Sequence, residues 1–230
     1  MIRFVGTSAL LCAAPAFAAM LGPSPYLSSA DSPFAGGSFT YFHLENFESG
    51  SLTVPGVTLS GGSFLAPSGT TDSVDGDDGS IDGSGTAGRS LYSSGLSSLS
   101  FTFDPLALGS LPTHAGIVWT DIGTATPTFG VGPVTFQAFD ASNVLIGTIG
   151  PTSLGDGSVN GFTAEDRFFG VTHAAGISRI VISMSNTTDW EVDHLQYGLA
   201  SAAIPEPGTM LLTGAGLLAA FALKRRPRSN

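Results

Sequence analysis

The sequence is almost without cysteine: among its 230 residues the single one is Cys12, in an apolar stretch near the N-terminus. One thiol excludes an internal disulfide, and it also excludes a zinc site of the C-x-x-C type. The folded part must therefore be stabilised by a packed core. The roughly 180 residues between the two apolar ends of the chain are enough to build one such domain.

Basic residues are scarce as well. All 18 acidic residues except Glu206 lie between Met20 and Ile204, but only three of the 8 basic residues do, namely Arg89, Arg167 and Arg179, which gives this region a formal charge of −14. Such a surface repels nucleic acid and acidic polymers. The charge balance therefore excludes nucleic acid as a partner and favours divalent cations or neutral sugars.

Familiar catalytic motifs are missing too. The four histidines are scattered, and no two of them have the H-x-x-x-H spacing of a zinc site. The mature region also contains no G-x-S-x-G nucleophile motif. Residues 83–88 fit G-x-G-x-x-G, but clustered aspartates precede them and no helix is expected after them, so they predict a turn and not a nucleotide loop. On an extended strand Asp193 and His194 would point to opposite faces. No acid–base pair is therefore predicted there.

Short β-strands account for most of what is present. Apolar and aromatic residues alternate in about nine segments that are separated by Gly, Pro, Asn and Asp, and no helical period occurs between the two ends of the chain. This pattern predicts an all-β fold, a single antiparallel β-sandwich of jelly-roll-like type over residues 38–200, preceded by a loose linker over 19–37. The expected strands are Phe39–Phe47, Leu52–Leu59, Leu99–Phe103, Ala115–Asp121, Val134–Phe139, Val144–Ile149, Asp166–Val171, Ile177–Met184 and Trp190–Tyr197.

The N-terminus has the organisation of a secretory signal peptide. Arg3 supplies a positive charge, Phe4–Ala14 is apolar, and Ala16-Phe17-Ala18 is an A-x-A cleavage site after the helix breaker Pro15. We expect residues 1–18 to be removed during export, which leaves a mature chain without cysteine.

The C-terminus combines three features in a fixed order. Ile204-Pro205-Glu206-Pro207-Gly208 breaks the chain, Met210–Leu223 is uncharged and apolar, and Lys224, Arg225 and Arg226 form a basic cluster. We expect a transmembrane helix at about residues 208–224 within a tail that covers 204–230. The cations place the end of this helix in the cytoplasm.

This tail resembles the PEP-CTERM sorting signal of Gram-negative bacteria that make exopolysaccharide. The resemblance covers about the last 25 residues, with Pro205, Glu206, Pro207, Lys224, Arg225 and Arg226 at the matching positions. It implies an exosortase as partner, which cleaves near the Pro-Glu-Pro. It also implies a precursor anchored in the inner membrane and a mature form at the cell surface or in the extracellular matrix.

An acidic loop is a candidate metal site. Five aspartates lie within residues 72–82, and oxygen-only ligands select Ca²⁺, although the spacing is not that of an EF-hand. A solvated acidic loop is the simpler interpretation. If calcium does bind, the expected ligands are Asp75, Asp77 and Asp82.

Aromatic residues are candidates for sugar binding. Trp190 and Tyr197 could stack on a glycan at the surface, whereas Trp119 lies inside an apolar strand and is expected in the core. The sequence therefore predicts an exported envelope protein with a non-catalytic interaction or structural module and exopolysaccharide among its partners. The alternative is an extracellular carbohydrate-active hydrolase, because two carboxylates about 5 to 10 Å apart would suffice.

Overall fold

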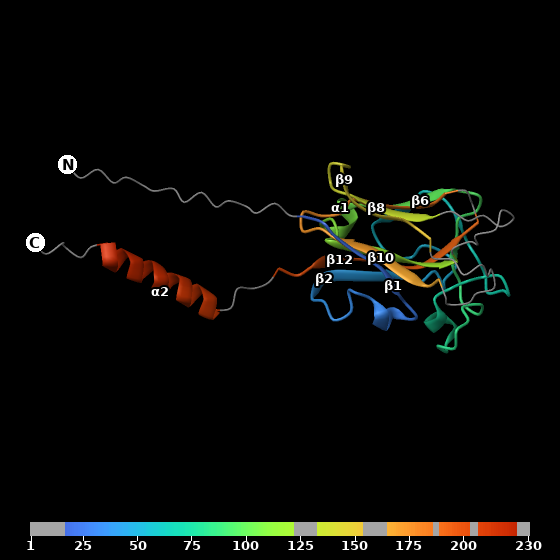
Figure 1. Cartoon of the computed structure of the whole chain (residues 1–230), viewed down its shortest axis with the longest axis horizontal. Coiled ribbons are helices and arrows are strands. Elements are labelled where there is room, and N and C mark those ends of the chain that lie inside the picture. The colour runs from blue at the N-terminus through green and yellow to red at the C-terminus, as the bar shows by residue number, and fades with distance from the viewer. Residues whose placement is uncertain (1–16, 122–132, 154–164, 186–188, 203–206, 225–230) are drawn as a thin grey trace, which may run out of the picture. The chain divides into compact units, whose positions relative to one another are not determined.

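The computed structural model describes residues 17–121, 133–153, 165–185, 189–202 and 207–224, and its contacts divide the chain into two units, 1–200 and 201–230. The first unit contains two antiparallel sheets, seen as two layers in Figure 1. Most of the predicted signal peptide lies outside the described residues and stays a prediction. The first strand begins at Ala19, immediately after the predicted cleavage site.

The larger sheet has seven strands in the order β1-β10-β7-β12-β5-β4, with β2 also paired to β12. The smaller has five, in the order β3-β6-β11-β8-β9. From β6 onward the chain changes sheet at every connection except the one from β8 to β9. The strands are β1 Ala19–Pro25, β2 Phe39–Glu45, β3 Val57–Leu59, β4 Ser63–Phe64, β5 Leu91–Tyr92, β6 Ser98–Phe103, β7 His114–Asp121, β8 Val134–Phe139, β9 Leu145–Thr152, β10 Arg167–Thr172, β11 Arg179–Met184 and β12 Glu191–Ala200.

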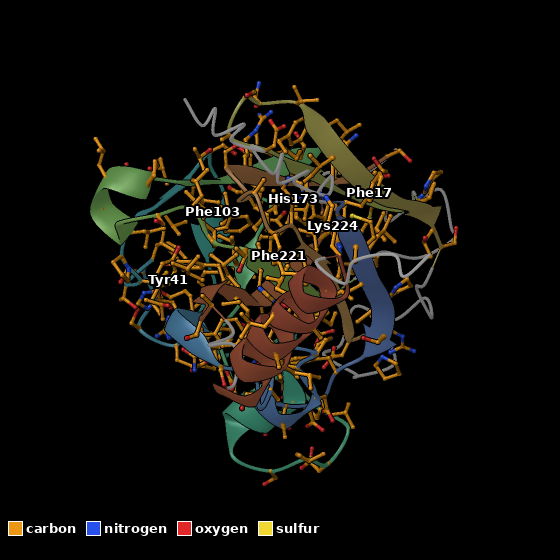
Figure 2. All side chains as sticks on the ribbon, turned by 90° about the vertical axis from the view of Figure 1, so that its left-hand side faces the viewer. Phe17, Tyr41, Phe103, His173, Phe221 and Lys224 are labelled. Atoms are coloured by element: carbon orange, nitrogen blue, oxygen red, sulfur yellow. The ribbon has the colours of Figure 1, made fainter. Side chains whose placement is uncertain are left out.

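One apolar core joins the two sheets, and side chains fill the space between the layers (Figure 2). In β8 every second residue is buried, from Val134 through Phe136 to Ala138, which is the alternation that the sequence predicts. Phe136 and Ile182 of the smaller sheet share this core with Trp119 of the larger one. The predicted antiparallel sandwich is therefore present, while its jelly-roll-like character stays a prediction.

The outer face of the larger sheet is also covered. A second apolar cluster there contains Tyr26, Phe34, Val74, Val118 and Phe168. Along β7 Val118 points to this cluster, whereas its neighbour Trp119 points to the main core. Two segments supply the cover: residues 26–37, and the acidic loop, by which we mean residues 66–90.

The predicted linker over residues 19–37 is therefore wrong. Its first part is β1, which pairs with β10, and the short 3₁₀ helix η1 (Ser29–Asp31) follows, held by the side chains of Ser28 and Asp31. Tyr26 is completely buried. The segment lacks alternation because β1 is an edge strand with Pro23 and Pro25, and it is attached mainly through its backbone.

The described residues also include three short helices and the C-terminal helix. The 3₁₀ helix η2 (Asp75–Asp78) lies in the acidic loop, and α1 (Pro105–Leu108) is capped by Asp104. In the second unit, α2 runs over Pro207–Lys224, close to the predicted bounds. Within the described residues, no helix combines the length and the apolar character needed to cross a membrane. The transmembrane role of this segment is therefore not shown.

Candidate functional site: buried carboxylates beneath the acidic loop

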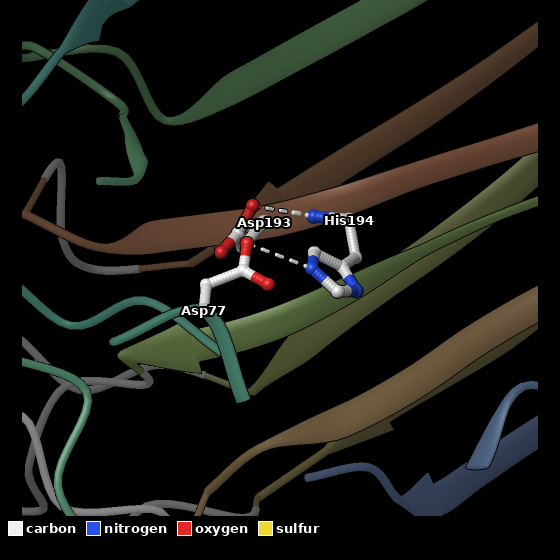
Figure 3. A group of neighbouring side chains, drawn as sticks. All are labelled: Asp77, Asp193 and His194. Atoms are coloured by element: carbon white, nitrogen blue, oxygen red, sulfur yellow. Dashed lines mark hydrogen bonds and ion pairs between the residues drawn. The ribbon is translucent and has the colours of Figure 1, made fainter. Parts of the chain in front are cut away.

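A β-bulge in β12 turns two neighbouring polar side chains to the same side. The register between β12 and β7 shifts between Asp193 and Gln196, and His194 has a left-handed backbone with φ 45°. The two-residue alternation of a strand is interrupted at such a bulge. Asp193 and His194 both reach toward Asp77 of the acidic loop, as Figure 3 shows. The prediction that they point to opposite faces is therefore wrong.

A chain of largely buried hydrogen bonds passes through this bulge. Ser32 donates to Gln196 Oε1 at 2.5 Å, and Gln196 Nε2 donates to the Tyr26 hydroxyl at 2.9 Å. The Tyr26 proton is then directed to His194 Nδ1 at 2.8 Å. His194 Nε2 consequently carries a hydrogen and donates to Asp77 Oδ2 at 2.9 Å. The contacts thus define a single direction of donation along five side chains.

The Asp193 carboxylate has the most unusual environment. It is completely buried, and its two oxygens accept the backbone N–H groups of Val74 at 3.0 Å and His194 at 2.6 Å. Burial raises the pKa of Asp193 well above its usual range, and the nearby Asp77 charge adds to this effect. Burial and the Asp193 charge also raise the pKa of Tyr26.

Side-chain carboxylates attach the acidic loop to β12, which also pairs with β5 and β7. Glu191 accepts the N–H of Asp72 at 3.0 Å, and two residues further on Asp193 accepts that of Val74. The same Glu191 carboxylate accepts a hydrogen bond from the Ser90 hydroxyl. The N–H groups of residues 72 and 74 therefore donate to the side chains of residues 191 and 193 of β12.

Within the loop, Asp75 acts as an internal acceptor. It is completely buried, and its carboxylate accepts the N–H groups of residues 82, 83 and 84 at 3.1 to 3.3 Å. Val74, beside it, packs in the outer apolar cluster. The interpretation of residues 72–82 as a solvated loop is therefore wrong in its first part, since Asp72, Ser73, Val74 and Asp75 are all buried.

The three predicted calcium ligands are divided between two groups. Asp75 and Asp82 come together, but with Asp78, and one carboxylate oxygen of each lies within 4.8 Å of the others. Asp77 instead joins Asp193 and His194 in a second group of the same size. In that second group the nitrogen and oxygen atoms already bond to one another or to backbone N–H groups. The Asp75 carboxylate of the first group likewise accepts three backbone N–H groups, so the two groups differ only in their donor atoms, which are oxygens alone in the first group.

A further buried carboxylate, which the sequence did not indicate as a site, lies next to Asp75. Asp166 immediately precedes β10, and its backbone oxygen accepts the N–H of Tyr26. Its side chain is fully buried, and burial, with the Asp75 charge nearby, raises the pKa of Asp166 to about 9. The Asp75 N–H faces this carboxylate and partly offsets the effect.

The glycine motif at residues 83–88 has a packing role. A Cβ atom on Gly85 would lie 2.1 Å from the backbone oxygen of Ser73, and one on Gly88 would lie 2.1 Å from the Ser73 hydroxyl. Side chains at these two positions would push the returning chain away from Ser73. Close approach to Ser73 therefore accounts for Gly85 and Gly88, whereas Gly83 has no neighbour near its Cβ position and is explained by its left-handed backbone, with φ 91°.

The predicted glycan-stacking residues are not at the surface. Trp190 and Tyr197 are both completely buried in the main core, where the rings of Trp190 and Trp119 lie 4.8 Å apart. These two residues therefore cannot stack on a glycan, and that prediction is wrong. Trp119 is in the core, as expected.

An exposed groove lies elsewhere, between β2 and the segment that follows η1. It has a volume of about 450 Å³, and Phe42 on its rim is 38% exposed. Ser32 and Gln196, the first two members of the hydrogen-bonded chain, line it. The other lining residues, Ser29, Phe34, Ala35, Gly36, Gly37, Phe39, Thr40, Tyr41 and Leu44, are also uncharged.

Four of the predicted sorting residues, Pro205, Glu206, Arg225 and Arg226, lie outside the described residues. Pro207 is the first residue of α2 and Lys224 is its last. The order along the chain is thus a compact β-sandwich, a short connection and a helix that ends at a cation.

Comparison with protein-family models identifies the C-terminal tail. Residues 203–226 match the PEP-CTERM protein-sorting motif. The protein is therefore an exported protein with a sorting signal that is processed by exosortase, as the sequence predicted. Searches of curated proteins and of solved structures gave no significant match.

Proposed function

We propose that the protein is a component of the cell envelope or extracellular matrix whose β-sandwich is a non-catalytic interaction or structural module. The observation that carries this proposal is the sorting motif at residues 203–226, which directly follows one folded unit. A tail of this kind determines where the attached domain is delivered. The proposed activity is therefore adhesion or assembly at that location.

We also propose that the precursor is held at the inner membrane before exosortase acts. The helix α2 has 18 residues and a length of about 27 Å. Flanking residues and the side chain of Lys224 could extend it toward the roughly 30 Å of a bilayer core. The mature sandwich would then reach the surface, with neutral exopolysaccharide as its expected partner.

The polar groups of the site support a structural role more than a hydrolytic one. Asp193 and His194 are 0% and 2% exposed. Their contacts with Val74, Tyr26 and Asp77 attach the acidic loop and the N-terminal segment to β12. A general acid or base must reach its substrate within hydrogen-bonding distance. Asp193 and His194 therefore cannot serve a carbohydrate-active hydrolase while they are buried, and that alternative would have to use other carboxylates.

The test is to replace Pro205, Glu206 and Pro207 with alanine in full-length protein, produced in a bacterium that has an exosortase. We expect export to continue and the uncleaved precursor to accumulate in the inner membrane, which cell fractionation and mass spectrometry of the C-terminal peptides would detect. The control is Pro227→Ala, one residue beyond the matched segment, which should be processed normally. Unchanged processing and location of the triple variant would contradict the sorting role.

A second measurement distinguishes the module from the enzyme. The mature protein is incubated with the exopolysaccharide of the producing strain, and both sedimentation with the polymer and release of reducing ends are recorded. Co-sedimentation without new reducing ends is the expected result. Release of reducing ends that increases with protein concentration would favour the hydrolase.

A further inference from the structure

The exposed groove along β2, which we call the β2 groove, has an uncharged lining within a strongly acidic domain. Its lining residues come from β2, from residues 29–37 and from Gln196 of β12, and none of them is acidic or basic. The region between Met20 and Ile204 nevertheless has a formal charge of −14. An anionic ligand would be repelled by the domain without a cation in the groove to pair with, and a metal ion would find no carboxylate in the lining. The β2 groove therefore suits an uncharged ligand.

Phenylalanine side chains supply an aromatic surface in the β2 groove. Phe42 is 38% exposed, and the centre of its ring lies 5.0 Å from that of Phe39 and 6.3 Å from that of Phe34, which also line the groove. Gly198 of β12 permits this arrangement, because a Cβ atom there would lie 2.9 Å from the rings of both Phe39 and Phe42. The exposed part of Phe42 is thus an aromatic surface, held in place by its neighbours, on which the apolar face of a ligand can stack.

Polar groups in the lining discriminate among uncharged ligands. Gln196 is only 2% exposed; one hydrogen of its Nε2 atom is donated to the Tyr26 hydroxyl, and within the described part of the chain the other has no acceptor. Ser29 and Thr40 add exposed hydroxyl groups. A purely apolar ligand would cover these groups without giving them a partner, which costs free energy. The ligand should therefore carry hydroxyl groups as well as an apolar face.

We propose that the β2 groove binds a neutral saccharide, with Phe42 stacked on a sugar ring and the Gln196 amide donating to a sugar hydroxyl. A sugar ring has both required properties, since its C–H groups form an apolar face and its hydroxyls donate and accept hydrogen bonds. The groove volume of about 450 Å³ lies in the range of pockets that hold small ligands. The saccharide site rests on the proposed interaction module and gives that module a binding surface.

Binding of defined saccharides to the full-length protein tests the site. The protein is titrated in a calorimeter with neutral oligosaccharides of glucose, mannose and galactose, and with oligogalacturonate as the acidic counterpart of the galactose series. We expect at least one neutral oligosaccharide to bind saturably at one site per chain, and oligogalacturonate not to bind. Because the ligand is uncharged, its affinity should be the same at low and at high salt.

Substitutions of the lining residues identify the contacts. Phe42→Ala and Phe42→Leu should each weaken saccharide binding by about tenfold, whereas Phe42→Tyr keeps the aromatic ring and should stay within about threefold of the unchanged protein. Thr40→Val removes a hydroxyl without changing the shape of the side chain and should weaken binding by about threefold. The matched control is Leu145→Ala, at an exposed apolar position of β9, which should leave the affinity unchanged. All three positions are exposed, so the variants should fold, and the thermal midpoint of each verifies this.

Two results would overturn the proposal. The first is that no neutral oligosaccharide binds, or that oligogalacturonate binds equally well; a concentration-dependent dimer that Phe42→Ala dissociates would then identify a second copy of the chain as the occupant. The second is equal saccharide affinity of Phe42→Ala and the unchanged protein, which would place the sugar on another surface.

Sedimentation with exopolysaccharide separates a failure of this site from a failure of the interaction module. Loss of co-sedimentation in Phe42→Ala, but not in Leu145→Ala, would support the β2 groove as the binding surface. Equal co-sedimentation of Phe42→Ala and the unchanged protein would overturn the groove and leave the module in place. Absence of co-sedimentation for the unchanged protein would contradict the polymer as the partner of the module.

Discussion

Tyr26→Phe removes a single hydroxyl group at the centre of the buried hydrogen-bonded chain. Tyr26 is completely buried, accepts a hydrogen bond from Gln196 Nε2 at 2.9 Å and donates one to His194 Nδ1 at 2.8 Å. Gln196 and His194 are each only 2% exposed, so water cannot easily replace the lost partner. The substitution therefore leaves two buried polar atoms unsatisfied.

The magnitude follows from this count. Each buried polar atom left without a partner costs about 1–3 kcal/mol, and removal of the buried hydroxyl itself returns part of the loss. We expect Tyr26→Phe to lower the free energy of unfolding by about 2–4 kcal/mol. Tyr41→Phe is the matched control: its hydroxyl donates to the Ser110 backbone oxygen at 2.7 Å in an exposed place. Water can replace that contact, so the control should cost less than about 1 kcal/mol.

Chemical denaturation of the full-length protein measures both effects. The two tryptophans, Trp119 and Trp190, are buried in the main core and report on its unfolding by fluorescence. The transition of Tyr26→Phe should move to lower denaturant concentration with an unchanged slope, because the area exposed on unfolding is the same. If Tyr26→Phe costs no more than Tyr41→Phe, the hydrogen-bonded chain from Ser32 to Asp77 does not exist in solution and the reasoning is refuted.

The remaining predictions use the same unfolding assay. Phe136→Ala should lower the free energy of unfolding by about 3–5 kcal/mol, because Phe136 is completely buried. The control Leu106→Ala, at a position 93% exposed, should change it by less than about 0.5 kcal/mol. Similar costs for the two variants would contradict the assigned core. Burial and the Asp77 charge raise the folded pKa of Asp193, so between the unfolded value near 3.9 and that raised pKa the folded state binds the extra proton. The contribution of Asp193 to the free energy of unfolding should therefore fall as pH rises through this window, by at most about 1.4 kcal/mol per pH unit. Asp193→Asn should remove this pH dependence. Identical pH profiles of stability for the variant and the unchanged protein would contradict the prediction.

The strands of the main core could be predicted because their two faces differ. Val134, Phe136 and Ala138 are buried while their neighbours in β8 are less so, and this alternation is visible in the sequence. Three strands escaped prediction for physical reasons. β4 and β5 have two residues each, too few to show a period, and β1 is attached through its backbone at a sheet edge.

The candidate site was harder to predict because it depends on one irregular residue. The left-handed backbone of His194 turns Asp193 and His194 to the same side, and nothing in the local sequence requires this conformation. A signal was nevertheless present. The strand β12 contains Glu191, Asp193, His194 and Gln196 within six residues, flanked by Trp190 and Tyr197, and buried polar residues at this density require partners.

The acidic composition of the sandwich is thus partly structural. In a chain with three cations between Met20 and Ile204, carboxylates cannot all be paired with Arg or Lys, and several accept backbone N–H groups instead. Glu191, Asp193 and Asp75 together receive such groups from residues 72, 74, 82, 83, 84 and 194. Each of these contacts except that of residue 194 replaces a strand or helix partner that the acidic loop lacks. A glycine-rich segment without apolar alternation can in this way cover a sheet, because its backbone is held by side chains from β12 and from within the loop itself.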